Sequence, residues 1–217
     1  MQTPIERYPS GTSKRRVIDY ATQYFFKKGI RNVTMDSISQ GLKMSKRTLY
    51  QLFADKEQLI IACLEMMMDQ TLLLKEKMIA EKHETLEIIL KLMEMRLSHF
   101  SKMSERYVLD ISHYPAVKAF FEEFKNTYIE EGNVFIQKCM AEGTFRQDLN
   151  PLIISRAVYI SAFSVASSHD FDEFTLNEIV MNTTIITLRG CCTVKGIAII
   201  DRFLDEYYQR KIEPCAC

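Results

Sequence analysis

Two side chains that can recognise base edges stand four residues apart in the segment SKRTLYQLFADKEQL. Arg47 can bind guanine through paired hydrogen bonds, and Gln51 can bind adenine in the same way. In an α-helix, side chains four positions apart lie on the same face. The large apolar side chains of the segment fall on the opposite face, where they would anchor the helix to a core. These are Leu49, Leu52 and Phe53.

Groups that can contact phosphates flank this face. Thr48 and Tyr50 can donate hydroxyl groups, and Lys46 adds a positive charge at the N-terminal edge of the helix. The first turns of two neighbouring predicted helices, at Thr34 and Lys56, offer further anion sites through their backbone N–H groups. An amphipathic helix taken alone is equally typical of an ordinary surface helix.

The charge distribution favours a polyanion as the partner of this segment. The whole chain of 217 residues has a formal net charge of zero. Residues 1–60, however, contain eleven lysines and arginines against five aspartates and glutamates, a net charge of +6 that leaves −6 for the rest. A basic end on an otherwise acidic chain is the electrostatic pattern of nucleic-acid binding.

Helices are the only elements that the sequence predicts. Three short helices lie before residue 55, with starting caps at Thr12 or Ser13, at Thr34 and at Ser45. Gly29 is placed to end the first helix, and Gly41 to provide the turn between the second and the third. Asp55 and Gln58 form a capping-box pattern that opens a fourth. The longer predicted helices are Asp55–Ala80, Glu84–Lys102, Ser104–Ser112, Pro115–Ala141, Pro151–Ser168, Leu176–Cys191 and Thr193–Gln209.

Two short helices joined by a tight turn fit a helix-turn-helix motif, in which the second helix enters the DNA major groove. The predicted fold is therefore all-α. Residues 1–55 would form a three-helix DNA-binding domain, and residues 56–217 a larger helical body for ligand binding and dimerisation.

Enzyme chemistry and cofactors are not expected. The sequence contains no Gly-x-Ser-x-Gly, P-loop or His-Glu-x-x-His motif, and its His–Asp and His–Glu pairs have no third partner. The cysteine pairs Cys191-Cys192 and Cys215-Ala216-Cys217 could hold a soft metal, but they lack the Cys-x-x-Cys spacing of a zinc site. We therefore expect neither a metal nor a cofactor.

The chain is expected to be cytoplasmic. Its N-terminal segment MQTPIERYPSGTSKRR has no apolar stretch of the signal-peptide type, and no run approaches the length of a membrane span. The six cysteines lack a disulfide-framework spacing, which indicates reduced thiols.

The N-terminal residues resemble the TetR-type transcriptional regulators. The resemblance lies in VTMDSIS at residues 33–39 and MSKRTLYQLFADKEQL at residues 44–59, together with ATQYFFKKG at residues 21–29. It implies phosphate contacts by Thr34, Tyr50 and Lys56. It also implies groove contacts by Lys46, Arg47, Thr48 and Gln51. Gly41 replaces a frequent alanine of the family and Arg47 a frequent small residue, which suggests a base preference of its own.

The same resemblance implies a palindromic double-stranded DNA operator, a homodimer and a small apolar or amphipathic effector that relieves repression. The late predicted helices carry more apolar side chains than one buried face requires, which also indicates a surface for a partner. These residues are Val158, Ile160, Phe163, Val165, Ile179, Ile185, Ile186 and Leu188. Aromatic and methionine side chains could line an effector pocket, although such residues equally fill cores. The candidates are Met66, Phe100, Tyr107, Phe121, Phe124, Tyr128 and Phe163.

Two alternatives remain open on the sequence alone. The chain could regulate transcription without a small-molecule ligand. It could also be a helical interaction protein whose basic end binds nucleic acid, acidic partners or an anionic membrane without regard to base sequence.

Overall fold

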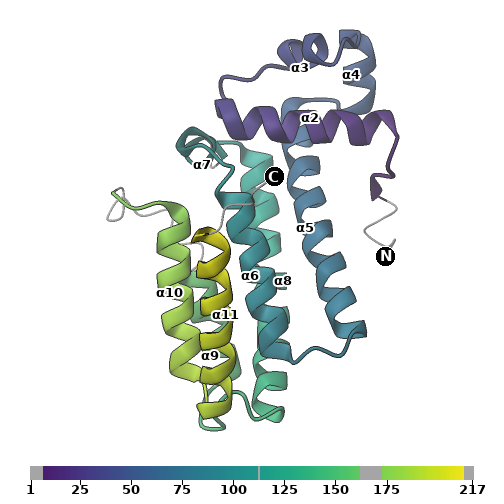
Figure 1. Cartoon of the computed structure of the whole chain (residues 1–217). Coiled ribbons are helices and arrows are strands. Elements are labelled where there is room, and N and C mark those ends of the chain that lie inside the picture. The colour runs from purple at the N-terminus through teal and green to yellow at the C-terminus, as the bar shows by residue number, and fades with distance from the viewer. Residues whose placement is uncertain (1–6, 112, 162–172, 213–217) are drawn as a thin grey trace. The chain divides into compact units, whose positions relative to one another are not determined.

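A computed structural model describes residues 7–111, 113–161 and 173–212 of the chain. The described residues form helices and no strand, apart from an isolated bridge between Phe145 and Cys192. The predicted all-α class is thus confirmed (Figure 1). The helices are α2 (Ser13–Lys28), α3 (Met35–Gly41), α4 (Lys46–Leu52), α5 (Lys56–Ala80), α6 (Thr85–Phe100), α7 (Glu105–Ile111), α8 (Pro115–Ala141), α9 (Pro151–Tyr159), α10 (Leu176–Cys191) and α11 (Val194–Ile212).

The chain divides into two compact units. The first unit comprises Met1–Lys77 and Lys102–Phe124, and the second comprises Met78–Ser101 and Lys125–Cys217. The first unit therefore extends beyond the three short helices into part of α5, α7 and the start of α8. This division describes packing, so a functional boundary after residue 55 stays a prediction.

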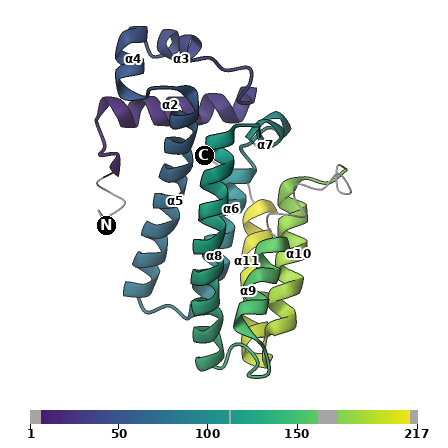
Figure 2. The ribbon, with the colours of Figure 1, turned by 180° about the vertical axis from the view of Figure 1, so that it is seen from behind.

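Three short helices pack around one apolar centre in the first unit. Ile18 and Phe25 of α2, Ile38 of α3 and Leu49 of α4 are all at most 1% exposed. Figures 1 and 2 show α3 and α4 next to one another beside α2. Burial of these side chains from each helix is the main force that holds the short helices, which would be marginal alone.

The predicted caps start these helices. The hydroxyl groups of Thr12, Thr34 and Ser45 accept hydrogen bonds from the backbone N–H three residues further on. The Asp55 carboxylate accepts from the Gln58 N–H in the same way, at 2.8 Å. Each cap satisfies a donor that the first helical turn leaves without a partner.

The turn between α3 and α4 uses a different residue from the one predicted. Gly41 is helical, and the left-handed position is held by Lys43, whose φ is +52°. Gly41 instead packs against Tyr20, and a Cβ atom there would lie 1.9 Å from the Tyr20 hydroxyl oxygen, so the tyrosine ring would have to move. The prediction that Gly41 provides the turn was therefore wrong.

The second unit is built on a separate core. Leu86, Leu90 and Leu97 of α6 pack with Leu188 of α10 and Ile200 of α11, and all are at most 1% exposed. Figures 1 and 2 show α9, α10 and α11 side by side in this unit. Within the described residues, no helix is long and apolar enough to cross a membrane.

Candidate nucleic-acid interface and ligand cavity

The short helix α4 presents the predicted polar face. Ser45 caps it, and Leu49 and Phe53, which are 0% and 4% exposed, attach it to the core. Arg47 and Gln51 are exposed, as the helical spacing predicted. The exposed face therefore carries one guanidinium and one amide, both capable of bidentate contacts with bases.

Lys46 forms an ion pair with Asp36, a residue that was not among the predicted site residues. Its ammonium group forms an ion pair with the carboxylate of Asp36 on α3. Both side chains are about half exposed, so the pair is accessible to water and to ions. The sequence did not predict this contact. The two residues are ten positions apart, and their contact depends on how α3 packs against α4.

The flanking hydroxyl groups are partly used within the protein. The Oγ1 atom of Thr48 lies 2.7 Å from the Ser45 Oγ atom. Thr34 forms a reciprocal capping box with Ser37, since the Thr34 hydroxyl accepts from Ser37 N–H and the Ser37 hydroxyl accepts from Thr34 N–H. Tyr50 is 48% exposed. A capping hydroxyl still has a hydrogen that it can donate to a phosphate oxygen.

Lys56 opens α5 and is less exposed than a typical surface lysine. Its ammonium group lies 5.7 Å from the centre of the Tyr114 ring. Desolvation lowers the pKa of Lys56, and the negative charge of Asp110 opposes this effect. The aromatic ring thus holds the cation near the first turn of α5.

Asp110 ties α7 to the connection between α2 and α3. This carboxylate is only 8% exposed and accepts a hydrogen bond from the Arg31 N–H at 2.8 Å. Nearby, the Ser104 N–H donates to the Phe26 carbonyl oxygen at 2.9 Å. Gly29 has a φ of +78°, and a Cβ there would lie 2.8 Å from the Arg106 Cβ. Sequence reasoning missed Asp110, since its partner is 79 positions away.

The residues predicted to line an effector pocket belong to different parts of the protein. Met66 and Tyr107 are buried in the core of the first unit, and Phe121 packs against that core. Phe124 also belongs to the first unit. Phe163 lies outside the described residues. Phe100 and Tyr128 are in the second unit, where both line the same small cavity.

This Arg96 cavity has a volume of about 40 Å³ and combines apolar walls with three polar groups. Arg96 donates a hydrogen bond from Nη1 to the Tyr128 hydroxyl oxygen at 2.7 Å. Thr184 is 5% exposed, and its Oγ1 has no hydrogen-bond partner in the described part of the chain. The cavity is lined by Ile89, Met93, Arg96, Phe100, Tyr128, Val158, Val180 and Thr184.

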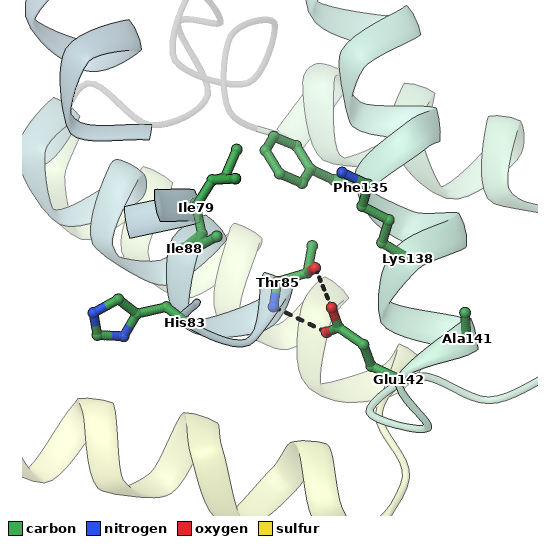
Figure 3. A pocket seen from close by; sticks show the side chains of 8 residues that line it. All are labelled: Ile79, His83, Thr85, Ile88, Phe135, Lys138, Ala141 and Glu142. Carbon is green, nitrogen blue, oxygen red and sulfur yellow. Dashed lines mark hydrogen bonds between the residues drawn. The ribbon is translucent and has the colours of Figure 1, made fainter. Parts of the chain in front are cut away.

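A wider groove lies elsewhere on the second unit (Figure 3). It has a volume of about 330 Å³ and is lined by Ile79, His83, Thr85, Ile88, Phe135, Lys138, Ala141 and Glu142. The Glu142 carboxylate accepts hydrogen bonds from the Thr85 N–H at 2.9 Å and the Thr85 hydroxyl at 2.6 Å (Figure 3). The Glu142 contact therefore supports the start of α6.

The buried thiols bond to the backbone. Cys191 and Cys192 donate to the carbonyl oxygens of Thr187 and Leu188, at 3.2 and 3.3 Å. Burial raises the pKa of Cys192 to about 12. No cluster of three or more histidine, cysteine or acidic side chains suited to a metal ion occurs in the ranges that the structure describes. Cys215 and Cys217 lie outside those ranges.

The fold and the α4 face together define an all-helical architecture with an N-terminal helix-turn-helix module. Residues 17–63 match the family of bacterial regulatory proteins known as the tetR family. This match falls on the segment whose motifs resemble that family.

Several solved structures share the fold of the chain. CprB from S. coelicolor A3(2), a TetR family protein, is 17% identical with a TM-score of 0.65, and the match covers 89% of this chain and 96% of CprB. SmeT, the repressor of the Stenotrophomonas maltophilia multidrug efflux pump SmeDEF, is 14% identical with a TM-score of 0.64, over 86% of this chain and 93% of SmeT.

A third structure, the ketosteroid transcriptional regulator KstR2 of Mycobacterium tuberculosis, is 18% identical with a TM-score of 0.56. The match covers 86% of this chain and 98% of KstR2. At these identities the likeness concerns the fold. No curated protein sequence matches the chain.

Proposed function

We propose that the protein is a homodimeric repressor that binds a palindromic DNA operator and is released from it by a small-molecule effector. The observation that carries this proposal is the exposed face of α4, on which Arg47 and Gln51 lie opposite the buried Leu49. Side chains of these two types can distinguish guanine and adenine in the major groove.

The contacts divide into base recognition and positioning. Arg47 and Gln51, with Lys46 and Thr48 at the start of α4, enter the groove in this proposal. Thr34, Tyr50 and Lys56 bind phosphates on either side, which fixes the orientation of α4 without selecting a sequence. The exposure of Tyr50 and the N-terminal positions of Thr34 and Lys56 support these roles.

An apolar surface of the second unit supports dimerisation. Ile153 and Ile160 of the α9 region and Ile186 of α10 are 63%, 54% and 70% exposed. Among the apolar residues from which a partner surface was predicted, Ile185 and Leu188 are instead buried in the core of their own unit, and Ile179 is also buried. Covering the exposed isoleucines with a second copy would remove them from water and would bring together two helix-turn-helix modules.

Effector control is supported by the cavity in the second unit and by the functions printed for two solved structures that share the fold. SmeT is described as a repressor and KstR2 as a ketosteroid transcriptional regulator. The Arg96 cavity provides apolar walls and a few polar groups, which is the usual chemistry of a small-molecule site.

Selection of duplexes from random DNA by the full-length protein tests the proposal. A two-fold symmetric sequence should be enriched, and the affinity for it should fall linearly with salt on a double logarithmic scale. Arg47→Ala should relax the preference at one position of each half-site, at a cost of about 1–3 kcal/mol. Arg202→Ala, which changes an exposed arginine of the second unit, serves as the control.

Enrichment of no symmetric sequence would contradict the proposal. Binding that ignores base sequence and is unchanged by Arg47→Ala would instead favour a helical interaction protein with a basic end.

A further inference from the structure

We infer that the Arg96 cavity binds the carboxylate group of a medium-chain fatty acid or a similar linear carboxylate. This inference rests on the effector-controlled function proposed above and names the chemical class of the effector. It is carried by a positioned cation, by a buried hydroxyl group that has no partner among the residues described, and by apolar walls, all within the second unit.

Arg96 is held in place without being neutralised. Its Nη1 atom donates to the Tyr128 hydroxyl, and its guanidinium carbon lies 4.8 Å from the centre of the Tyr128 ring. Among the residues that the structure describes, no carboxylate pairs with Arg96. The Tyr128 hydroxyl uses only one of the five N–H donors of an arginine, so others can bind a ligand. The planar guanidinium matches the two oxygens of a carboxylate.

Thr184 supplies a second polar group. Its side chain lines the cavity and is 5% exposed, and its Oγ1 lacks a partner in the described part of the chain. A buried hydroxyl without a partner destabilises a folded protein, so most such groups have an acceptor. A carboxylate oxygen bound to Arg96 would provide that acceptor.

The size and walls of the cavity favour a carboxylate over a larger anion. A volume of about 40 Å³ accommodates only a few non-hydrogen atoms, which suits a carboxylate better than a phosphate. The other walls are Ile89, Met93, Phe100, Val158 and Val180, which would contact the carbon atoms next to the carboxylate and would have to move apart to admit the rest of the chain. Met93 is unbranched and flexible, so it can make room for that chain.

Three probes of equal length test the charge preference: octanoate, octan-1-ol and octylamine. Titration calorimetry on the full-length protein at neutral pH should show octanoate binding at least tenfold more tightly than either other probe, since a charge-assisted hydrogen bond is worth more than a neutral one. Equal affinity for octanoate and octan-1-ol would overturn the inference.

Substitutions at the two polar groups separate recognition from folding. Arg96→Met keeps most of the apolar stem and should weaken octanoate at least tenfold without changing octan-1-ol. Arg202→Met, at an exposed arginine, is the matched control and should leave octanoate binding unchanged. Octanoate affinity that survived Arg96→Met would overturn the inference.

Thr184→Val should weaken octanoate binding about three- to tenfold. The same change should raise the Tm of the ligand-free protein by about 2–4 °C, because it removes a buried hydroxyl that lacks a partner. Thr187→Val is the control on the same helix, since the Thr187 hydroxyl donates to the Thr183 carbonyl oxygen at 2.9 Å. The proposed role of Thr184 in binding the carboxylate would be contradicted if Thr184→Val lowered the Tm as much as Thr187→Val does and left the octanoate affinity unchanged.

The selected operator distinguishes this inference from the proposed function. Operator binding that octanoate abolishes in the wild type but not in Arg96→Met supports both. Operator binding with no response to octanoate overturns the inference and leaves the DNA-binding function standing. If the protein binds octanoate but selects no operator from random DNA, the ligand assignment of the cavity is supported and the proposed repressor function is overturned.

Discussion

The exposed face of α4 and the Arg96 cavity both present an arginine and a hydroxyl group, but in opposite surroundings. On α4, Arg47 and Thr48 are exposed to water, and Thr48 already shares a hydrogen bond with the Ser45 cap. In the cavity, Arg96 is half-buried against Tyr128, and the buried Thr184 hydroxyl has no hydrogen-bond partner among the described residues.

This difference separates the two kinds of recognition. Exposed groups keep their hydration until a partner arrives, so α4 can carry several of them with little effect on folding. A buried hydroxyl loses its hydration when the protein folds, and a ligand that restores a hydrogen bond is correspondingly favoured. Substitutions on the α4 face should therefore change binding, whereas substitutions in the second unit should change binding and stability together.

Truncation of a fully buried leucine in each unit gives the largest expected effect. Leu49 of α4 is 0% exposed and Leu188 of α10 is 1% exposed. Leu49→Ala and Leu188→Ala should each lower the free energy of unfolding by about 2–5 kcal/mol, measured by urea denaturation. At low temperature, where both variants remain folded, only Leu49→Ala should weaken DNA binding, because it loosens α4. A cost below about 1 kcal/mol for Leu49→Ala would contradict its role as the anchor.

Loss of the buried Asp110 carboxylate should have a somewhat smaller effect. Asp110→Ala removes the acceptor of the Arg31 N–H and should destabilise the protein by about 1–3 kcal/mol. Hydrogen exchange at the Arg31 amide should become faster in the variant. Asp205→Ala, at an exposed aspartate of α11, is the control and should leave both quantities unchanged. Unaltered exchange at Arg31 would show that this hydrogen bond does not hold the α2–α3 connection.

Alkaline pH should destabilise both units through their buried thiols. Burial raises the pKa of Cys63 in the first unit, and of Cys139 and Cys192 in the second, from 9.0 to about 12. A raised pKa means that the unfolded chain loses these protons first, so the contribution to stability is present below pH 9 and is lost as the pH rises towards 12. The Tm should therefore fall over that range, and alkylation at pH 8 should spare these three cysteines until the protein is unfolded. Rapid alkylation of native Cys63 would contradict its burial.

The smallest effect is expected at an exposed ion pair. Arg202 on α11 pairs with Glu87 on α6 at 2.6 Å, with side chains that are 61% and 30% exposed. Arg202→Ala should cost less than about 1 kcal/mol, because solvent screens the pair. Thermal unfolding at low and high salt would measure this loss of stability. A loss as large as that of Leu188→Ala would contradict the expected difference between the surface and the core.

The two regions also differ in how far the sequence could predict them. The caps at Thr34 and Ser45, the anchor Leu49 and the exposed Arg47 all follow from contacts within one helical turn, and each was predicted. Local spacing is enough for such features, because a helix places neighbouring side chains in a known way.

Other features depend on packing between distant segments. The Asp36–Lys46 pair, the Asp110–Arg31 contact and the packing of Gly41 on Tyr20 were all missed, since no local pattern encodes them. The predicted pocket residues show the same limit. Aromatic side chains fill cores and line cavities alike, and only the tertiary structure separates Tyr107 from Tyr128.

In the proposed DNA-binding function, the ion pair between Asp36 and Lys46 has a kinetic consequence for the search along non-operator DNA. Asp36 acts as a counterion that travels with the protein, so Lys46 gains less from random phosphates than an unpaired lysine would. We expect Asp36→Asn to lengthen the residence time on non-operator DNA and to slow the search. A single carboxylate beside α4 would then set how quickly the protein leaves a DNA sequence other than its operator.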